Sequence, residues 1–434
     1  MTAVDDAPAV GPPEEVPLGR NRDFQLLWIG AGVMMLGHRV IVMAYPLLVL
    51  WASGSPSSAG LVGLMAMLPY LVVQLPAGAL VDRWDRRRVM ITTDVAGLLL
   101  GAGVTALVLT GHMWLPALMT LAFLQTTLAV LYQLAERAGM PQLVPDSQLS
   151  AALTRNEART RGAALIGQPI GSVLFSLVAW VPFLVGTVAH VVSLVSVLGI
   201  RGRLQSDQAP PAGKLWHDIR EGIAWMWGQH FLRVVMLLIA VSNAVFQAQT
   251  IALMVIFRDD GRSAALVGIV AACAGIGGMF GALSGGWWIQ RLMMRDIVIG
   301  GLLVWTVLVP PLAFTGQPWV LGVLFALSGY VGGVFNVAGA AYVVRVAPDR
   351  IRGRANSLAM LVGSAGLAVG PPVGGLALDA YGVTPTILGL AAAMALLVVM
   401  AVLSRSVRTA GPADPARHKA IAREPLAEHA DVAP

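Results

Sequence analysis

The sequence contains few charged residues and a single cysteine. Only 12% of its 434 residues are charged, whereas 57% are hydrophobic. Soluble domains carry about 25% charged residues, so this composition excludes an ordinary water-soluble fold. Cys273 lies inside an apolar stretch and has no second cysteine to pair with, which excludes an intramolecular disulfide.

Motifs of catalysis and nucleotide use are also missing. The chain has no Walker A sequence, no metal-ligand spacing and no Ser/His/Asp arrangement, so we expect no ATP hydrolysis, no metal, no cofactor and no enzymatic chemistry. The net charge of +6 invites a nucleic-acid interpretation, but the arginines stand in short clusters between apolar runs. We therefore expect no nucleic-acid partner.

Long apolar runs dominate the chain instead. A run of about 18 apolar residues predicts a transmembrane helix, whereas a transmembrane barrel alternates over about 10 residues. The runs here are continuous, so we predict an all-α protein embedded in the lipid bilayer. Twelve runs are found, near 24–51, 58–81, 89–109, 114–135, 158–179, 182–201, 231–257, 264–290, 296–315, 318–344, 357–380 and 383–404.

The distribution of lysine and arginine predicts the orientation of these spans. With a cytoplasmic N-terminus, the cytoplasmic segments hold 26 of the 29 Lys and Arg residues. Arg258 and Arg262 fall outside, and Arg39 lies within a span. This asymmetry follows the positive-inside rule, so both termini are predicted to be cytoplasmic. The first residues lack the features of a cleaved signal, so the first run is expected to remain as a span.

These boundaries divide the chain into five parts. They are a cytoplasmic N-terminal tail (1–23), an N-terminal six-helix bundle (24–201), a cytoplasmic linker with an amphipathic helix (202–230), a C-terminal six-helix bundle (231–404) and a disordered cytoplasmic tail (405–434).

The two bundles repeat each other at a fixed offset. The tripeptide Gly-Ala-Leu at 78–80 recurs at 281–283, and Pro-Asp at 145–146 recurs at 348–349, each 203 residues later. We therefore predict two pseudo-symmetric six-helix bundles that point the same way. Such halves can rock about a central site, which is the mechanical basis of alternating access.

Residues 78–88, Gly-Ala-Leu-Val-Asp-Arg-Trp-Asp-Arg-Arg-Arg, resemble motif A of the major facilitator superfamily. They lie between the second and third predicted spans, where the family has this motif, although Asp85 replaces its usual glycine. The segments 21–24 and 215–227 are similar to the branch of the enterobactin exporter and the macrolide-efflux-type permeases. The resemblance covers about residues 21–405. The matched positions of motif A are Gly78, Leu80, Asp82, Arg83, Arg86 and Arg87.

The resemblance implies a gating role for motif A. Asp82 ends the second predicted span, near the predicted start of the eleventh, where a carboxylate can accept hydrogen bonds from a helix N-terminus. In the family this contact holds the outward-facing state. Arg83, Arg86 and Arg87 are expected to close a charge network with Asp94 as one partner. In the alternative interpretation the arginines only orient the loop.

A second pattern resembles the antiporter motif C. Residues 370–375, Gly-Pro-Pro-Val-Gly-Gly, fit G-P-x-x-G-G, and 167–172 form a weaker copy. Glycines four residues apart permit close helix contact, and proline permits a bend at a gate. Ordinary small-residue packing is the alternative. The hinge candidates are Gly167, Pro169, Gly171, Gly370, Pro371, Gly374 and Gly375.

Polar residues inside the predicted spans are candidates for a substrate and proton cavity. His38 and Arg39 lie near the middle of the first span, where a charge is costly unless it faces a cavity or a partner. Arg39 would favour an anionic or acceptor-rich substrate, or it is structural and bonds backbone carbonyls. His38 could carry a coupling proton. The candidates are His38, Arg39, Gln125, Gln133, Asn243, Gln247 and Asn336.

The function implied by the resemblance is secondary active transport across the cell (inner, cytoplasmic) membrane by a monomer. We expect export of a small amphipathic compound, such as a drug, an antibiotic, a siderophore or a secondary metabolite. No Asp or Glu lies at the middle of a predicted span, where it could carry a proton. Proton antiport is therefore a hypothesis that rests on the resemblance and on His38. The alternatives are an importer of an anionic solute and, in another class, a membrane-embedded enzyme or an assembly factor.

Overall fold

The computed structural model describes residues 16–205, 228, 230–346 and 349–409, and the side chains of all of these except 343–360. Every regular element in the described residues is a helix. The predicted amphipathic helix of the linker and most of the two predicted tails lie outside the described residues.

The N-terminal half contains seven α-helices and one short 3₁₀ helix. They are α1 (Arg22–Ser53), α2 (Pro56–Val72), α3 (Gln74–Val81), α4 (Arg86–Leu109), α5 (Leu115–Gly139), η1 (Met140–Leu143), α6 (Asp146–Leu177) and α7 (Val181–Gly199).

The C-terminal half repeats this order over its described residues. Its helices are α9 (His230–Asp259), α10 (Ala265–Arg291), α11 (Met294–Leu308), η2 (Pro310–Ala313), α12 (Pro318–Val346), α13 (Asp349–Tyr381), α14 (Val383–Leu403) and α15 (Arg405–Arg408).

The helices confirm the predicted all-α membrane fold. Ten of the described helices are long and apolar enough to cross a membrane, and α2 with α3, bent by 47°, forms an eleventh span if the pair is counted as one. The predicted count of twelve includes α6, which has 32 residues but carries Asp146, Arg155 and Arg159 in its first half. About 20 residues span a bilayer, and only the 16 residues after Arg161 are free of charge, so the crossing of α6 extends into the turn that carries Arg159 and Arg161.

Helix α1 illustrates how the sequence sets helix ends and burial. Asn21 caps its first turn by accepting a hydrogen bond from the backbone N–H of Phe24 (3.1 Å). Gly54 ends it with φ 73°, a left-handed conformation that favours glycine. Every residue from 40 to 50 is buried, as expected of a helix surrounded by other helices.

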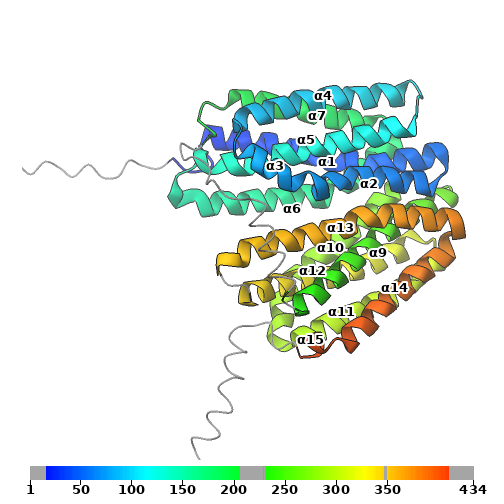
Figure 1. Ribbon diagram of the computed structural model, residues 1–434. Coiled ribbons are helices and arrows are strands. Elements are labelled where there is room, and N and C mark those ends of the chain that lie inside the picture. Colours follow the sequence, from blue (N-terminus) through cyan, green and yellow to red (C-terminus); the bar gives the residue numbers. More distant parts are fainter. Residues whose placement is uncertain (1–15, 206–227, 229, 347–348, 410–434) are drawn as a thin grey trace, which may run out of the picture.

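The internal repeat predicted from the sequence is visible in the helix boundaries. α5 begins at Leu115 and α12 at Pro318, while α6 begins at Asp146 and α13 at Asp349. Both pairs are 203 residues apart. Figure 1 shows the two halves as separate groups of helices, α1 to α7 in blue to green and α9 to α15 in green to red.

Small residues let the two halves touch. α2 packs against α13, and α6 packs against α10 (Figure 1). A Cβ atom on Gly60 would overlap the backbone carbonyl of Pro371, and one on Gly375 would overlap that of Pro56. Because glycine has no Cβ, the backbones of α2 and α13 come into direct contact.

A carboxylate joins the halves at one end of this interface. Asp379 accepts hydrogen bonds from the backbone N–H of Ser57 (3.0 Å) and from the hydroxyl of Ser55 (3.2 Å). These residues lie at the α1–α2 connection and near the end of α13, which is the extracellular side in the predicted topology. In that topology the contact closes the outer end of the interface.

We predict that Asp379→Ala shifts the protein toward states that are open at this end. The change removes two hydrogen bonds, each of which contributes about 0.5–1.5 kcal/mol. Pulsed electron paramagnetic resonance, with spin labels at the outer ends of α2 and α13 in a Cys273→Ala background, should show a larger population at long distances. Asp260→Ala is the control, because Asp260 pairs with Arg262 of its own half. An equal shift in both variants would contradict the prediction.

Candidate substrate cavity

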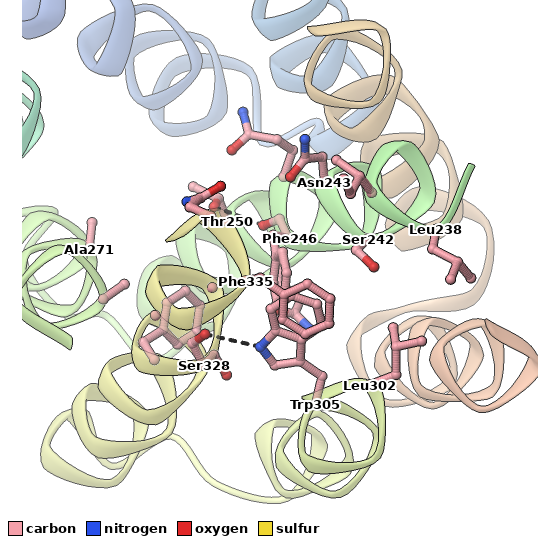
Figure 2. Close-up of a pocket in the computed structure, with 18 of the residues that line it drawn as sticks. Leu238, Ser242, Asn243, Phe246, Thr250, Ala271, Leu302, Trp305, Ser328 and Phe335 are labelled. Carbon is pink, nitrogen blue, oxygen red and sulfur yellow. Dashed lines mark hydrogen bonds between the residues drawn. The ribbon is translucent and has the colours of Figure 1, made fainter. Parts of the chain in front are cut away.

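The C-terminal half contains a cavity of about 330 Å³ (Figure 2). α9, α10, α11 and α12 form most of its wall, and Gln168 of α6 reaches it from the N-terminal half. Ligand pockets have volumes of about 300–1,000 Å³, so this cavity can hold a small molecule.

Three aromatic rings form one wall of the cavity. The Trp305 and Phe335 rings are stacked, with centroids 5.0 Å apart at 15°, and Phe246 meets Trp305 edge-on at 4.8 Å and 76°. The indole Nε1 of Trp305 donates to the carbonyl of Ser328 (3.0 Å; Figure 2). Since this is the only hydrogen-bond donor of the ring system, the wall offers the ligand apolar ring surface.

Uncharged polar groups complete the lining. Asn243 donates from Nδ2 to the carbonyl of Gly363 (3.2 Å), and the buried Nε2 of Gln249 has no hydrogen-bond partner. Gln247 and Asn336 also line the cavity, and no Asp, Glu, Lys, Arg or His is found among the described lining residues. The cavity therefore suits an uncharged ligand that has an apolar body and a few hydrogen-bonding groups.

A smaller cavity of about 60 Å³ lies between the two halves. Its lining includes Met43 of α1 and Pro371 of α13. It shares Gln168, Gln247 and Thr250 with the larger cavity. The ligand cavity is thus adjacent to the surface along which the halves would have to move.

The structure divides the predicted cavity residues into two groups. Asn243, Gln247 and Asn336 line the large cavity. The other four are not part of this lining. Their side chains are placed in the N-terminal half: His38, Arg39, Gln125 and Gln133.

The four residues of the N-terminal group mostly contact other residues of the N-terminal half. The Nε2 of His38 lies 3.3 Å from the hydroxyl of Tyr70, and the Gln125 side-chain oxygen accepts from the Tyr45 hydroxyl (2.8 Å). The Nε of Arg39 is buried without a hydrogen-bond partner. Sequence reasoning missed the aromatic wall, because Phe246, Trp305 and Phe335 look like ordinary apolar residues of their runs.

Motif A lies in the turn between α3 and α4. Asp85 caps α4 by accepting from the backbone N–H of Arg88 (2.8 Å), which explains why aspartate can replace the family's glycine. Arg86 donates to the carbonyls of Ala138 (2.8 Å) and Leu204 (3.1 Å). These bonds tie the turn to the end of α5 and to the segment that follows α7.

Among the described residues, the remaining arginines form no charge network. Arg87 donates to the carbonyl of Leu198 (2.9 Å), and Arg83 is exposed. The expected pairing with Asp94 is wrong, because this carboxylate is buried and accepts from His190 and Ser193 instead. Burial deep between α4 and α7 places Asp94 out of reach of the arginines at the surface.

Comparison with known proteins identifies the family. The family described as transmembrane secretion effector, a group of major facilitator transporters, matches residues 16–432. The chain belongs to this family of membrane transporters. It is similar to the multidrug efflux pump Tap of Mycolicibacterium fortuitum, with 27% identity over 86% of this chain and 93% of the relative. Macrolide efflux protein A of Streptococcus pyogenes is 26% identical over 36% of this chain and 38% of the relative.

Solved structures show the same fold. The nucleoside transporter NupG superimposes with a TM-score of 0.70 at 12% identity, over 87% of this chain and 98% of NupG. A bacterial homologue of the lysosomal transporter Spinster, in an inward-facing conformation, gives 0.67 at 15% identity over 89% of this chain and 96% of that one. The family match and the similar efflux proteins confirm the predicted superfamily, its efflux branch and the non-enzymatic function.

The glycines of the motif C patterns lie at helix contacts of the transporter. A Cβ on Gly171 would lie 2.6 Å from the carbonyl oxygen of Val40, and one on Gly374 would lie 2.7 Å from the Cα of Ala248. α6 continues as a helix through Pro169, and α13 does so through Pro371. The close contact is observed, whereas the hinge at these prolines stays a prediction.

We predict that Trp305→Ala lowers the affinity of the transporter for its substrate. Loss of the stacked indole removes an aromatic contact worth about 0.5–1.5 kcal/mol, or roughly a two- to tenfold change in affinity. Accumulation of candidate compounds in cells that express the transporter measures the effect. Trp319→Ala is the control, since Trp319 is 72% exposed and lies outside the cavity. Equal accumulation with both variants would exclude Trp305 from the binding site.

The gating role of motif A makes a second prediction. Asp82 is exposed and has no partner among the described residues, and the side chains at the start of α13, its expected partner, lie outside them. If Asp82 binds that helix in the outward-facing state, Asp82→Asn should lower transport and increase the inward-facing population seen by spin-label distances. Asp85→Asn should change neither, because asparagine is also a good N-cap. Unaltered transport and distances in Asp82→Asn would refute the latch.

Proposed function

We propose that this transporter exports a small amphipathic compound, such as an antibiotic or another secondary metabolite, from the cytoplasm. The observation that carries the proposal is the cavity itself, in which an aromatic wall faces uncharged amide and hydroxyl groups. Such a lining binds apolar ring systems by contact and selects among them by a few hydrogen bonds. It offers no opposite charge to a strongly ionic solute.

The relatives support the direction of transport. The names of the Tap protein and of macrolide efflux protein A describe efflux of drugs and of macrolides, respectively. We therefore infer export, with small lipophilic antibiotics as first candidates, by a monomer in the cytoplasmic membrane.

Alternating access and proton antiport are the mechanism that we propose. Two parallel halves meet along α2–α13 and α6–α10, and the ligand cavity adjoins this interface. Rocking of the halves would expose Gln168, Gln247 and their neighbours first to one side and then to the other. A proton gradient would drive this cycle, since the chain has no nucleotide-binding motif.

The alternative of an anionic-solute importer has less support. It was suggested by Arg39, whose side chain does not line the large cavity. The cavity contains no cationic group among its described lining residues, so an anion would find no charge partner there.

Transport by the purified protein in proteoliposomes tests the proposal. With an imposed pH gradient, we expect uptake of a labelled small lipophilic antibiotic from a panel into vesicles in the efflux direction. Asn243→Asp should reduce transport of neutral compounds and favour cationic ones, because it places a carboxylate in the cavity. Gln317→Glu, an exposed position, is the charge-matched control. Transport of anions alone, or no transport of any compound, would overturn the proposal.

A further inference from the structure

A buried polar cluster lies in the N-terminal half, outside the cavity. Asp94 of α4 is fully buried, with one carboxylate oxygen 3.0 Å from Nδ1 of His190 and the other 2.7 Å from the hydroxyl of Ser193, both on α7. The Ser193 hydroxyl also lies 2.8 Å from the hydroxyl of Tyr132 on α5. Asp94 is eight residues from the start of α4, which places it about 12 Å along a membrane helix.

Counting hydrogens determines the direction of these bonds. Ser193 has one hydroxyl proton, which it donates to the carboxylate, so Tyr132 must donate to Ser193. A neutral His190 donates its Nδ1–H to the other carboxylate oxygen and leaves Nε2 free to accept a proton. The cluster can thus take up one proton at Nε2 without losing any hydrogen bond.

Charge balance separates this cluster from the other buried acid of the same half. Glu136 is paired with Arg159 (3.2 Å) and also accepts from Asn156 (2.9 Å), so its charge is compensated. Among the described residues, the only ionisable group that pairs with Asp94 is His190. The pair carries a net charge of −1 when the imidazole is neutral. Uptake of one proton makes the pair neutral. The ionisable groups that interact electrostatically with members of the cluster include His38, Glu136 and Arg159, and His38 in turn interacts with Arg39.

At the positions that correspond to this cluster, the C-terminal half has apolar residues, so the fold does not require polar residues there. The burial pattern of α11 follows that of α4 with an offset of 204, so that Met90 corresponds to Met294 and Asp94 to Val298. In α14 the same offset places Met394 at the position of His190.

The remaining two members of the cluster are also replaced by apolar residues. Leu397 of α14 takes the place of Ser193 at the offset of 204, and Phe335 of α12 takes that of Tyr132 at the offset of 203. One half therefore packs this position with hydrocarbon, while the other keeps a carboxylate, an imidazole and two hydroxyls. A buried ionisable group is costly in a membrane, so its presence calls for a function.

We propose that Asp94 and His190 form the site that binds the coupling proton of the transporter. This inference rests on the proposed proton antiport. His190 is the less buried member of the pair, because its side chain is 11% exposed whereas that of Asp94 is 0%. The same helix α7 is held near its end by Arg87 of motif A, which bonds the Leu198 carbonyl. A change of charge at His190 therefore acts on a helix that is attached to the gating turn.

Infrared difference spectroscopy of the reconstituted protein tests the site without a substrate. A pH titration should show a coupled imidazole and carboxylate signal in the wild type. Asp94→Asn and His190→Gln should each abolish it, and Glu136→Gln, the matched buried-acid control, should retain it. A wild-type spectrum without such a signal, or a signal that survives Asp94→Asn, would overturn the proposal.

Flux measurements then test the coupling. In proteoliposomes with the labelled antibiotic, Asp94→Asn should lose the stimulation by a pH gradient, measured relative to its own exchange flux at equal pH. Stimulation equal to that of the wild type would refute the coupling role. If the wild type itself shows no stimulation, proton antiport fails, whereas the infrared signal still decides whether the site binds a proton.

A variant that carries the corresponding residues of the C-terminal half tests whether loss of the cluster only causes a folding defect. The variant Asp94→Val/His190→Met/Ser193→Leu/Tyr132→Phe copies the C-terminal half. We expect it to be monodisperse in detergent and to lack the pH-gradient stimulation. If both Asp94→Asn and this variant fail to fold, the cluster is structural and the proposal is wrong.

Discussion

The direct contact between helix backbones at the interface of the two halves is the constraint on which the rest of the structure depends. Gly60 and Gly375 have no Cβ, so α2 and α13 touch along their backbones. In a membrane, helices gain little from the hydrophobic effect and associate through such close packing. A contact made of small residues can be broken and remade by rigid rotation, which is what a rocking mechanism requires.

The two halves share a fold but use it differently. In the C-terminal half the central position of α12 is Phe335, which stacks on Trp305 and forms the wall of the cavity. At the corresponding position of α5 stands Tyr132, whose hydroxyl belongs to the buried Asp94 cluster. The same helical framework therefore provides an apolar ligand site on one side and an ionisable cluster on the other. In the proposed antiport, this division would place the substrate site in one half and the proton site in the other.

Several features could be predicted from the sequence, and the residues show why. Hydropathy gave the helices, and the repeat of 203 residues gave the pairing of α5 with α12 and of α6 with α13. The role of Asp85 as an N-cap and the aromatic wall were not predicted. Both depend on where a backbone N–H or a ring points, and hydropathy carries no such information.

What the sequence by itself determined was the membrane fold, the two halves and the superfamily, because apolar length, repeat spacing and motif A are properties of contiguous residues. What only the tertiary structure decided was which polar groups meet. Asp94 was expected to pair with the arginines of motif A, which lie at the start of its helix. It contacts His190 instead, 96 residues away. Two buried groups so far apart in the chain find each other only through packing, since a polar group shielded from water must bond whatever the neighbouring helix presents.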